Sequence, residues 1–254
     1  AVTTWLTPDA FLKWGWRAAF MASILLVAVG MFIRLRIVET PAFAKIRDTH
    51  AVAKVPAREV FTDYRGNVLL GWGARYIDGV IFNIYAVFAL SYLIGIHHYA
   101  KSAILVAVTL AALVLMFMIP IASRLSDRIG RKPMMSAFLI AGAVATIPLF
   151  LALSDGFLTV LAVQCAGMGI TALMMASLGT ALAEMFPARI RVLATGTAFS
   201  LATAIFGGTV PAIGTALHER GLDLAFPIYL VVLHLVALPV VFRCRETAHT
   251  PLPD

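Results

Sequence analysis

The chain has 254 residues, of which 61% are hydrophobic and only 13% charged, and its mean hydropathy is +0.92. Soluble domains carry about 25% charged residues, so this chain cannot cover a surface that faces water, and a soluble globular protein is excluded. The net charge of +7 does not indicate a nucleic-acid partner, because the basic residues are dispersed in short loops and form no basic helix face.

Two cysteines, Cys165 and Cys244, provide neither a disulfide framework nor the spacing of metal ligands. The chain has no H-E-x-x-H, no P-loop and no G-x-S-x-G sequence. We therefore expect no enzyme, no metal site and no cofactor.

A membrane-spanning helix needs about 20 mostly apolar residues, and seven stretches of this chain meet that requirement. They lie at roughly 16–33, 67–95, 102–122, 134–153, 157–182, 193–217 and 225–242. These runs are rich in Leu, Ala, Val, Ile and Phe with scattered Gly, which is typical of bundled membrane helices. The predicted fold class is all-α, a polytopic transmembrane helix bundle with about seven spans.

The polarity pattern divides the chain into four parts. Residues 1–33 hold an external loop and the first span. Residues 34–66 carry charges of both signs and are too polar to span, so we interpret them as a cytoplasmic linker between two halves of a larger bundle. A six-helix bundle at 67–242 and a cytoplasmic tail at 243–254 follow.

The basic residues are distributed unequally between the two sides of the predicted bundle. Loops of one parity hold fifteen of the 20 Lys and Arg residues: Arg34, Arg36, Lys45, Arg47, Lys54, Arg58, Arg65, Arg124, Arg128, Arg131, Lys132, Arg189, Arg191, Arg243 and Arg245. Loops of the other parity hold Lys13, Arg17, Lys101 and Arg220. The positive-inside rule places the richer side in the cytoplasm, with the N-terminus outside and the C-terminus inside. An odd number of spans with an external N-terminus and no signal peptide predicts that at least one further span precedes the first residue.

The second predicted span carries ionisable residues within an apolar run, GWGARYIDGVIFNIYAVF. Arg75 and Asp78 share a helix face near the membrane midplane, where secondary transporters bind their substrates. Asn83 and Tyr85 lie within the same broad half of the helix and are candidate polar lining. Two interpretations stay open. Either Arg75 binds a substrate carboxylate or Asp78, with Asp78 as the proton carrier, or the pair neutralises itself and locks the helix against a neighbour.

Two later spans carry further candidates. Gly207, Gly208 and Pro211 interrupt the sixth span, where glycines allow close helix contact and Pro211 removes a backbone hydrogen bond. This is a possible hinge or cavity-lining segment, or else a feature of packing alone. His234 in the last span is a weaker candidate for proton movement, because a lone histidine in a helix is more often satisfied by a neighbour.

A charged turn, SRLSDRIGRKP at 123–133, separates the third and fourth predicted spans. Asp127 can face a helix end, Gly130 permits a tight turn, and the cations can pair with helix termini. The segment resembles the G-x-L-x-D-R-x-G-R-[RK] loop of the major facilitator superfamily, with Ser123 in place of the first glycine. The positions that match are Leu125, Asp127, Arg128, Gly130, Arg131 and Lys132.

Two longer segments resemble one branch of that superfamily, the metabolite:proton symporters, which includes carriers of proline and betaine, shikimate, citrate and α-ketoglutarate. WGWRAAFMASILLVAVGMFIRLRIVETPAF, from residue 14, is similar to their sixth helix and the following loop. LAEMFPARIRVLATG, from residue 182, is similar to their junction between the tenth and eleventh helices. The resemblance covers the chain only as helices six to twelve, so it implies a C-terminal part whose N-terminal half is missing.

The resemblance also implies a cytoplasmic gate, in which charged groups exchange partners between inward- and outward-facing states. The alternative is an ordinary interfacial cluster that fixes helix ends. The candidate gate residues are Asp127, Arg128, Gly130, Arg131, Glu184, Arg189 and Arg191.

The function implied is that of a proton-coupled symporter in the bacterial inner membrane, which imports a small polar metabolite by alternating access. An organic acid or a zwitterion fits Arg75. The expected partners are this substrate, protons, the lipid bilayer and the missing N-terminal half. Two alternatives remain: a non-transporting fragment or membrane interaction partner, and an uncoupled facilitator or exchanger.

Overall fold

The computed structural model describes residues 8–36, 56–154 and 156–250. Its contacts divide the chain into two units, Ala1–Ala51 and Val52–Asp254, which we describe one at a time. In the first unit, helix α2 (Pro8–Ala10), the π-helical turn η1 (Phe11–Gly15) and helix α3 (Trp16–Arg36) follow one another directly. The stretch Lys13–Arg36 is long and apolar enough to cross a membrane, as predicted for the first span.

The second unit begins with α5 (Pro56–Thr62) and continues with six further helices of membrane-spanning length and composition. These are α6 (Arg65–Asn83) with η2 (Ile84–Phe88) and α7 (Ala89–Gly95); α8 (Lys101–Ile129); α9 (Arg131–Leu151), followed by η3 (Ala152–Ser154); α10 (Phe157–Glu184); α11 (Arg191–Ala202) with η4 (Thr203–Gly207) and α12 (Gly208–Glu219); and α13 (Ala225–Arg243). The part of the chain that the structure describes contains no strand, and the predicted all-α bundle with seven spans is confirmed.

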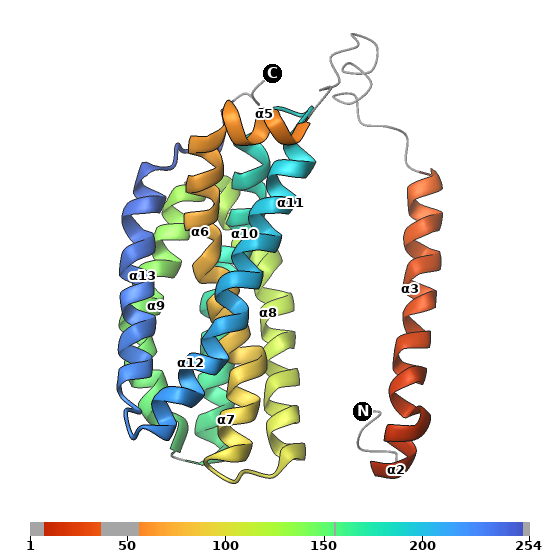
Figure 1. Ribbon diagram of the computed structural model, residues 1–254, viewed down its shortest axis with the longest axis vertical. Coiled ribbons are helices and arrows are strands. Elements are labelled where there is room, and N and C mark those ends of the chain that lie inside the picture. The colour runs from red at the N-terminus through yellow and green to blue at the C-terminus, as the bar shows by residue number, and fades with distance from the viewer. Residues whose placement is uncertain (1–7, 37–55, 155, 251–254) are drawn as a thin grey trace. The chain divides into compact units, whose positions relative to one another are not determined.

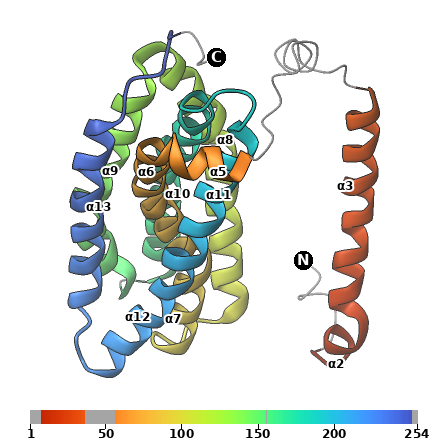
Figure 2. The same cartoon turned by 45° about the horizontal axis from the view of Figure 1, so that its top comes forward.

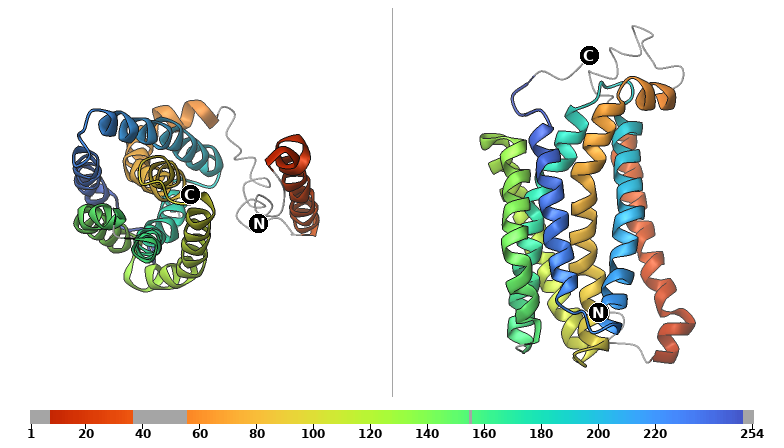
Figure 3. Two further views of the ribbon diagram at one scale, coloured as in Figure 1. Left: turned by 90° about the horizontal axis from the view of Figure 1, so that it is seen from below. Right: turned by 60° about the vertical axis from the view of Figure 1, so that its left-hand side comes forward.

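The six spans of the second unit run alternately up and down and lie side by side (Figures 1 and 3). The first turns of α6, α9 and α11 and the last turns of α8, α10 and α13 therefore meet at one end of the bundle. We call it the basic end, because Arg65, Arg131, Arg191 and Arg243 lie in those turns. Helix α5 lies across this end (Figure 2).

Several helices extend beyond the predicted apolar runs, because the backbone stays helical where the side chains become polar. Helix α8 was expected at 102–122 but continues to Ile129 through charged residues. Part of the predicted linker at 34–66 is also helical, as α5. Its Val60 is buried in a cluster with Phe186 and Ile190, so this segment packs on the bundle.

The core of the bundle consists of large apolar side chains and glycines. Ile77, Phe138 and Leu182 are fully buried. A methyl group at Gly71 would lie 2.8 Å from the Leu182 side chain, so a glycine permits the close approach of α6 and α10. Large apolar residues such as Val144 are exposed on the outer faces, where lipid solvates them.

In the second unit, two spans contain a π-helical turn, η2 in the second span of the chain and η4 in the sixth, and η4 contacts α6. Pro211 follows η4 and has no N–H to donate to the Gly207 carbonyl, so the helical ladder is broken at this point. The backbone departs from an α-helix at η4, which ends at Gly207, while Gly208 and Pro211 lie in α12. Such π turns occur frequently at functional sites, and a hinge here stays a prediction.

Candidate functional site

Arg75 and Asp78, one turn apart on α6, form an ion pair inside the bundle. Arg75 is 7% exposed and Asp78 is 2% exposed. A single charge at the centre of a membrane helix costs about 2.5–3.5 kcal/mol on insertion scales, and pairing offsets part of that cost. Protein encloses both groups, so neither is presented to lipid.

The pair lies against α11 and η4. The Arg75 guanidinium stacks over Phe199, with Cζ 3.9 Å from the ring centroid, and Nη2 donates to the Thr203 hydroxyl at 3.4 Å. Among the described residues, Arg75 Nε and Asp78 Oδ1 have no hydrogen-bond partner. The pair therefore joins two helices and keeps one donor and one acceptor for a further group, which is compatible with both interpretations of its role.

Asn83 and Tyr85 lie on opposite edges of the face that carries the pair. Asn83 Nδ2 donates to the Gly79 carbonyl at 2.8 Å and lies close to Gly207 of η4. The Tyr85 ring lies instead over Gly167 of α10. Residues two positions apart on a helix point about 200° away from one another, so these two side chains meet different neighbours. Asn83 lies on the η4 side, where Thr203 contacts Arg75.

At the basic end, α8 and α9 are joined by the single residue Gly130, whose φ is 110°. A residue with a side chain rarely adopts this conformation. Arg131 Nη1 donates to Asp127 Oδ1 at 2.5 Å, and its Nη2 reaches Glu184 Oε1 of α10 at 3.4 Å. The structure thus brings four of the predicted gate residues together.

The C-terminal segment adds a carboxylate to this cluster that sequence reasoning missed. Glu246 accepts hydrogen bonds from the backbone N–H of Arg131 at 2.9 Å and of Lys132 at 3.1 Å. In return, Lys132 Nζ donates to the Phe242 carbonyl at the end of α13 at 2.6 Å. An anion therefore lies at the positive end of one helix dipole and a cation at the negative end of another, and both arrangements are favourable.

Burial works against the charged form of Glu246, but hydrogen bonds from backbone N–H groups outweigh it and lower the pKa of this carboxyl below its ordinary value. The neighbouring Thr247 hydroxyl donates to Glu184 Oε2 at 2.5 Å. One signal could have revealed this contact. Helix α9 begins directly after Gly130, which has no side chain that could cap it, so its first N–H groups are open to water or to an acceptor from elsewhere in the chain.

The other predicted gate residues have different partners. Arg189 Nε donates to Glu59 Oε1 of α5 at 2.7 Å, and this hydrogen bond raises the pKa of Arg189. Arg191 Nε donates to the Phe186 carbonyl at 3.1 Å. Arg128 is exposed, and no described residue forms an ion pair with it. The seven residues therefore do not form one connected network.

A cavity of about 470 Å³ opens beside this cluster at the basic end. It is lined by Tyr64, Asn67, Leu70, Glu184, Met185, Arg245, Glu246, Thr247 and Thr250. In the described part of the chain, no group of three or more His, Cys, Asp or Glu residues is arranged to hold a metal ion.

A family model described as the Major Facilitator Superfamily matches residues 71–253, the stretch that holds both the ion pair and the Gly130 turn. The chain belongs to the Major Facilitator Superfamily. No solved structure matches it at a significant level.

Curated relatives in this superfamily match almost the whole chain. The ectoine/proline transporter ProP of Corynebacterium glutamicum is 29% identical over 99% of the chain and 53% of its own length. The alpha-ketoglutarate permease of Escherichia coli is 30% identical over 91% of the chain and 54% of its own length. The citrate-proton symporter of Klebsiella pneumoniae is 32% identical over 90% of the chain and 52% of its own length. The resemblance to metabolite:proton symporters is confirmed, and the chain spans about half the length of these relatives.

Proposed function

We propose that the chain is the C-terminal part of a proton-coupled secondary transporter in the bacterial inner membrane, which imports an organic acid or a zwitterion by alternating access. The observation that carries this proposal is the buried ion pair of Arg75 and Asp78 in the second span. The relatives' names support the substrate class, because citrate, α-ketoglutarate and proline all bear a carboxylate.

The geometry suggests how proton and substrate are coupled. Protonation of Asp78 neutralises the carboxylate that holds Arg75, and the guanidinium then lacks an anionic partner. A substrate carboxylate can take that place, while Phe199 and Thr203 keep the guanidinium oriented. Loss of the proton restores the ion pair and displaces the substrate. Because Arg75 binds one carboxylate at a time, the two binding events are linked.

The charged cluster at the basic end is proposed as the gate on the cytoplasmic side. Arg131 and Glu184 connect α9 to α10, and Glu246 connects the C-terminal segment to α9. The Glu246 hydrogen bonds are exposed, so water can replace each partner at modest cost, whereas the Arg131 and Glu184 side chains are partly buried. The exposed contacts are suited to repeated opening and closing.

One observation favours the uncoupled facilitator or exchanger as a second candidate. Protein covers the ion pair on all sides in this conformation, and Phe199 stacks on Arg75. A pair that never separates would lock α6 to α11 and would leave transport independent of protons.

The test is uptake of labelled carboxylates and betaines by the protein from the complete gene, carrying Asp78→Asn. We expect loss of accumulation driven by a pH gradient, because the amide cannot exchange a proton. Substrate exchange across the membrane should continue, because it requires no deprotonation.

The matched control is Asp223→Asn, which removes an exposed carboxylate paired with His218 near the other end of the bundle. It should accumulate substrate normally. Undiminished accumulation by Asp78→Asn would remove Asp78 from the proton path and would favour the uncoupled candidate. No uptake of any tested metabolite by the unmodified protein would favour a non-transporting role.

A further inference from the structure

Two deeply buried hydrogen-bond acceptors lie inside the bundle, away from the ion pair. His234 on α13 and Gln164 on α10 are each 1% exposed. His234 Nδ1 lies 2.8 Å from the Leu230 carbonyl, which can only accept, so Nδ1 carries the proton and Nε2 of the neutral ring is an acceptor. Gln164 Nε2 donates to the Tyr85 carbonyl at 3.3 Å, so Oε1 is its acceptor.

No described residue donates a hydrogen bond to His234 Nε2 or to Gln164 Oε1. Leaving one buried acceptor unsatisfied costs about 1–3 kcal/mol, and most buried polar atoms in native structures have a hydrogen-bond partner. We therefore expect each of these two acceptors to have a donor outside the described side chains.

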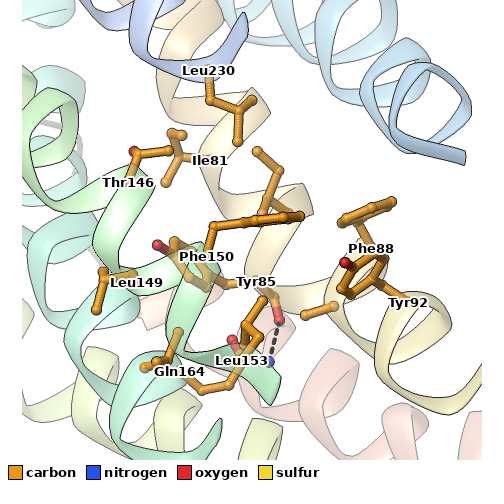
Figure 4. Close-up of a pocket in the computed structure, with 13 residues that line it drawn as sticks. Ile81, Tyr85, Phe88, Tyr92, Thr146, Leu149, Phe150, Leu153, Gln164 and Leu230 are labelled. Carbon is orange, nitrogen blue, oxygen red and sulfur yellow. Dashed lines mark hydrogen bonds between the residues drawn. The ribbon is translucent and has the colours of Figure 1, made fainter. Parts of the chain in front are cut away.

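Both residues line small cavities that share part of their lining. His234 lines a cavity of about 10 Å³ together with Gly142 and Gly167, and Gln164 lines one of about 30 Å³ (Figure 4). The residues that line both are Ile81, Tyr85, Thr146 and Leu149. A water molecule needs about 10–15 Å³ of such space and two to four polar partners, so each cavity is large enough for at least one.

Two glycines create the room for the polar rings that bound these cavities. A methyl group at Gly142 would overlap the His234 imidazole, with Nε2 as the nearest atom. A methyl group at Gly167 would overlap the Tyr85 ring at its hydroxyl-bearing end. The positions of His234 and Tyr85 thus depend on glycines at positions 142 and 167. These two residues shape the cavities.

The lining also specifies the charge of the ligand. The titratable groups that face the two cavities are His234, Tyr85 and Tyr92, and none of the lining side chains is an acid, a lysine or an arginine. An ion would have no counter-charge there, and a neutral molecule that donates hydrogen bonds fits best.

We propose that the interior of the bundle contains a hydration site, in which water donates to His234 Nε2 and to Gln164 Oε1 and lies beside Tyr85 and Thr146. The site is separate from the Arg75–Asp78 pair and does not depend on the proposed transport. Because Gln164 also holds the Tyr85 carbonyl within η2, the bound water supports the backbone at the point where the second span departs from an α-helix.

Radiolytic labelling of the purified protein tests this site without a variant. Hydroxyl radicals made from water by X-rays react close to where they form, so a buried side chain is oxidised only where water is bound beside it. We expect oxidation of His234 and Tyr85. The control is Tyr76, also buried, whose hydroxyl donates to the Leu233 carbonyl at 2.6 Å and should stay unmodified. If His234 and Tyr85 are oxidised no faster than Tyr76, the proposal is overturned.

A variant then assigns the water to its acceptor. In His234→Leu the oxidation rate of Tyr85 should fall toward that of Tyr76, because the cavity loses one of its polar partners. An unchanged rate at Tyr85 in a folded His234→Leu protein would contradict binding at His234.

Discussion

At the level of single residues, Glu246 shows how a carboxylate far along the chain completes the start of a helix. Helix α9 starts at Arg131 without a side-chain cap, and Glu246 accepts from its first two N–H groups. A charged group at a helix N-terminus typically contributes about 0.3–1 kcal/mol, and Glu246 belongs in this range because it is exposed.

We predict that Glu246→Gln lowers stability at neutral pH by about 0.5–1 kcal/mol. The pKa of Glu246 is lower in the folded protein than its ordinary value of 4.5. Its contribution is therefore fully present above the unfolded pKa and is lost as the pH falls through the folded pKa. Thermal unfolding of both proteins at neutral and at strongly acidic pH measures this difference.

Glu219→Gln is the matched control, since Glu219 is exposed at the opposite end of the bundle. It should unfold like the unmodified protein at either pH. If the two proteins still differ in thermal stability at a pH below the folded pKa, the charge of Glu246 is not what stabilises α9.

At the level of elements, η4 packs against α6 through small residues. A methyl group at Gly207 would lie 2.7 Å from Asn83 Nδ2 and 3.3 Å from the Gly79 carbonyl. At the adjacent Gly208, the same methyl group would have no atom within 4 Å. Close packing of the two irregular spans therefore depends on one glycine of this neighbouring pair.

The pair Gly207→Ala and Gly208→Ala tests this dependence. We expect Gly207→Ala to lose about 1–3 kcal/mol through overpacking and to slow transport if η4 is a hinge. Gly208→Ala should be neutral or stabilising by up to about 1 kcal/mol, because alanine favours a helix. Thermal stability and uptake are measured for both variants. If the two variants are equally stable and transport at the same rate, the close contact of Gly207 with α6 is contradicted.

At the level of the whole molecule, the basic end is proposed to face the cytoplasm. Short loops rich in Lys and Arg remain on that side during insertion, and the six spans of the second unit bring their basic turns to one end (Figure 1). The alternating direction of the helices then places the turn at Gly221 and Leu222 on the external side.

Single cysteines introduced at Leu222 and at His249, both exposed, test this orientation after replacement of Cys165 and Cys244 by serine. In intact cells, a thiol reagent that cannot cross the membrane should label Leu222→Cys but not His249→Cys. Both should react once the cells are opened. Labelling of His249→Cys in intact cells would invert the proposed orientation.

Local properties of the sequence were enough to predict the seven spans and the charged turn. Whether a stretch crosses a bilayer depends on how its apolar length compares with the thickness of the hydrocarbon core, about 30 Å. Neither of these two lengths depends on another part of the chain. The spacing of Asp127, Gly130 and Arg131 is likewise contained in one short segment. The pairing of Arg75 with Asp78 followed because helix geometry brings residues three apart onto one face.

Only the tertiary structure decided which partners these groups have across helices. Glu246 meets Arg131 from 115 positions away, and Tyr85 faces α10 while Asn83 faces η4. Among the described residues, His234 Nε2 has no hydrogen-bond partner, and it lies beside a glycine of α9. In each case the partner depends on which helix packs alongside and at what depth, and that arrangement is set by the combined packing of all the spans of the bundle.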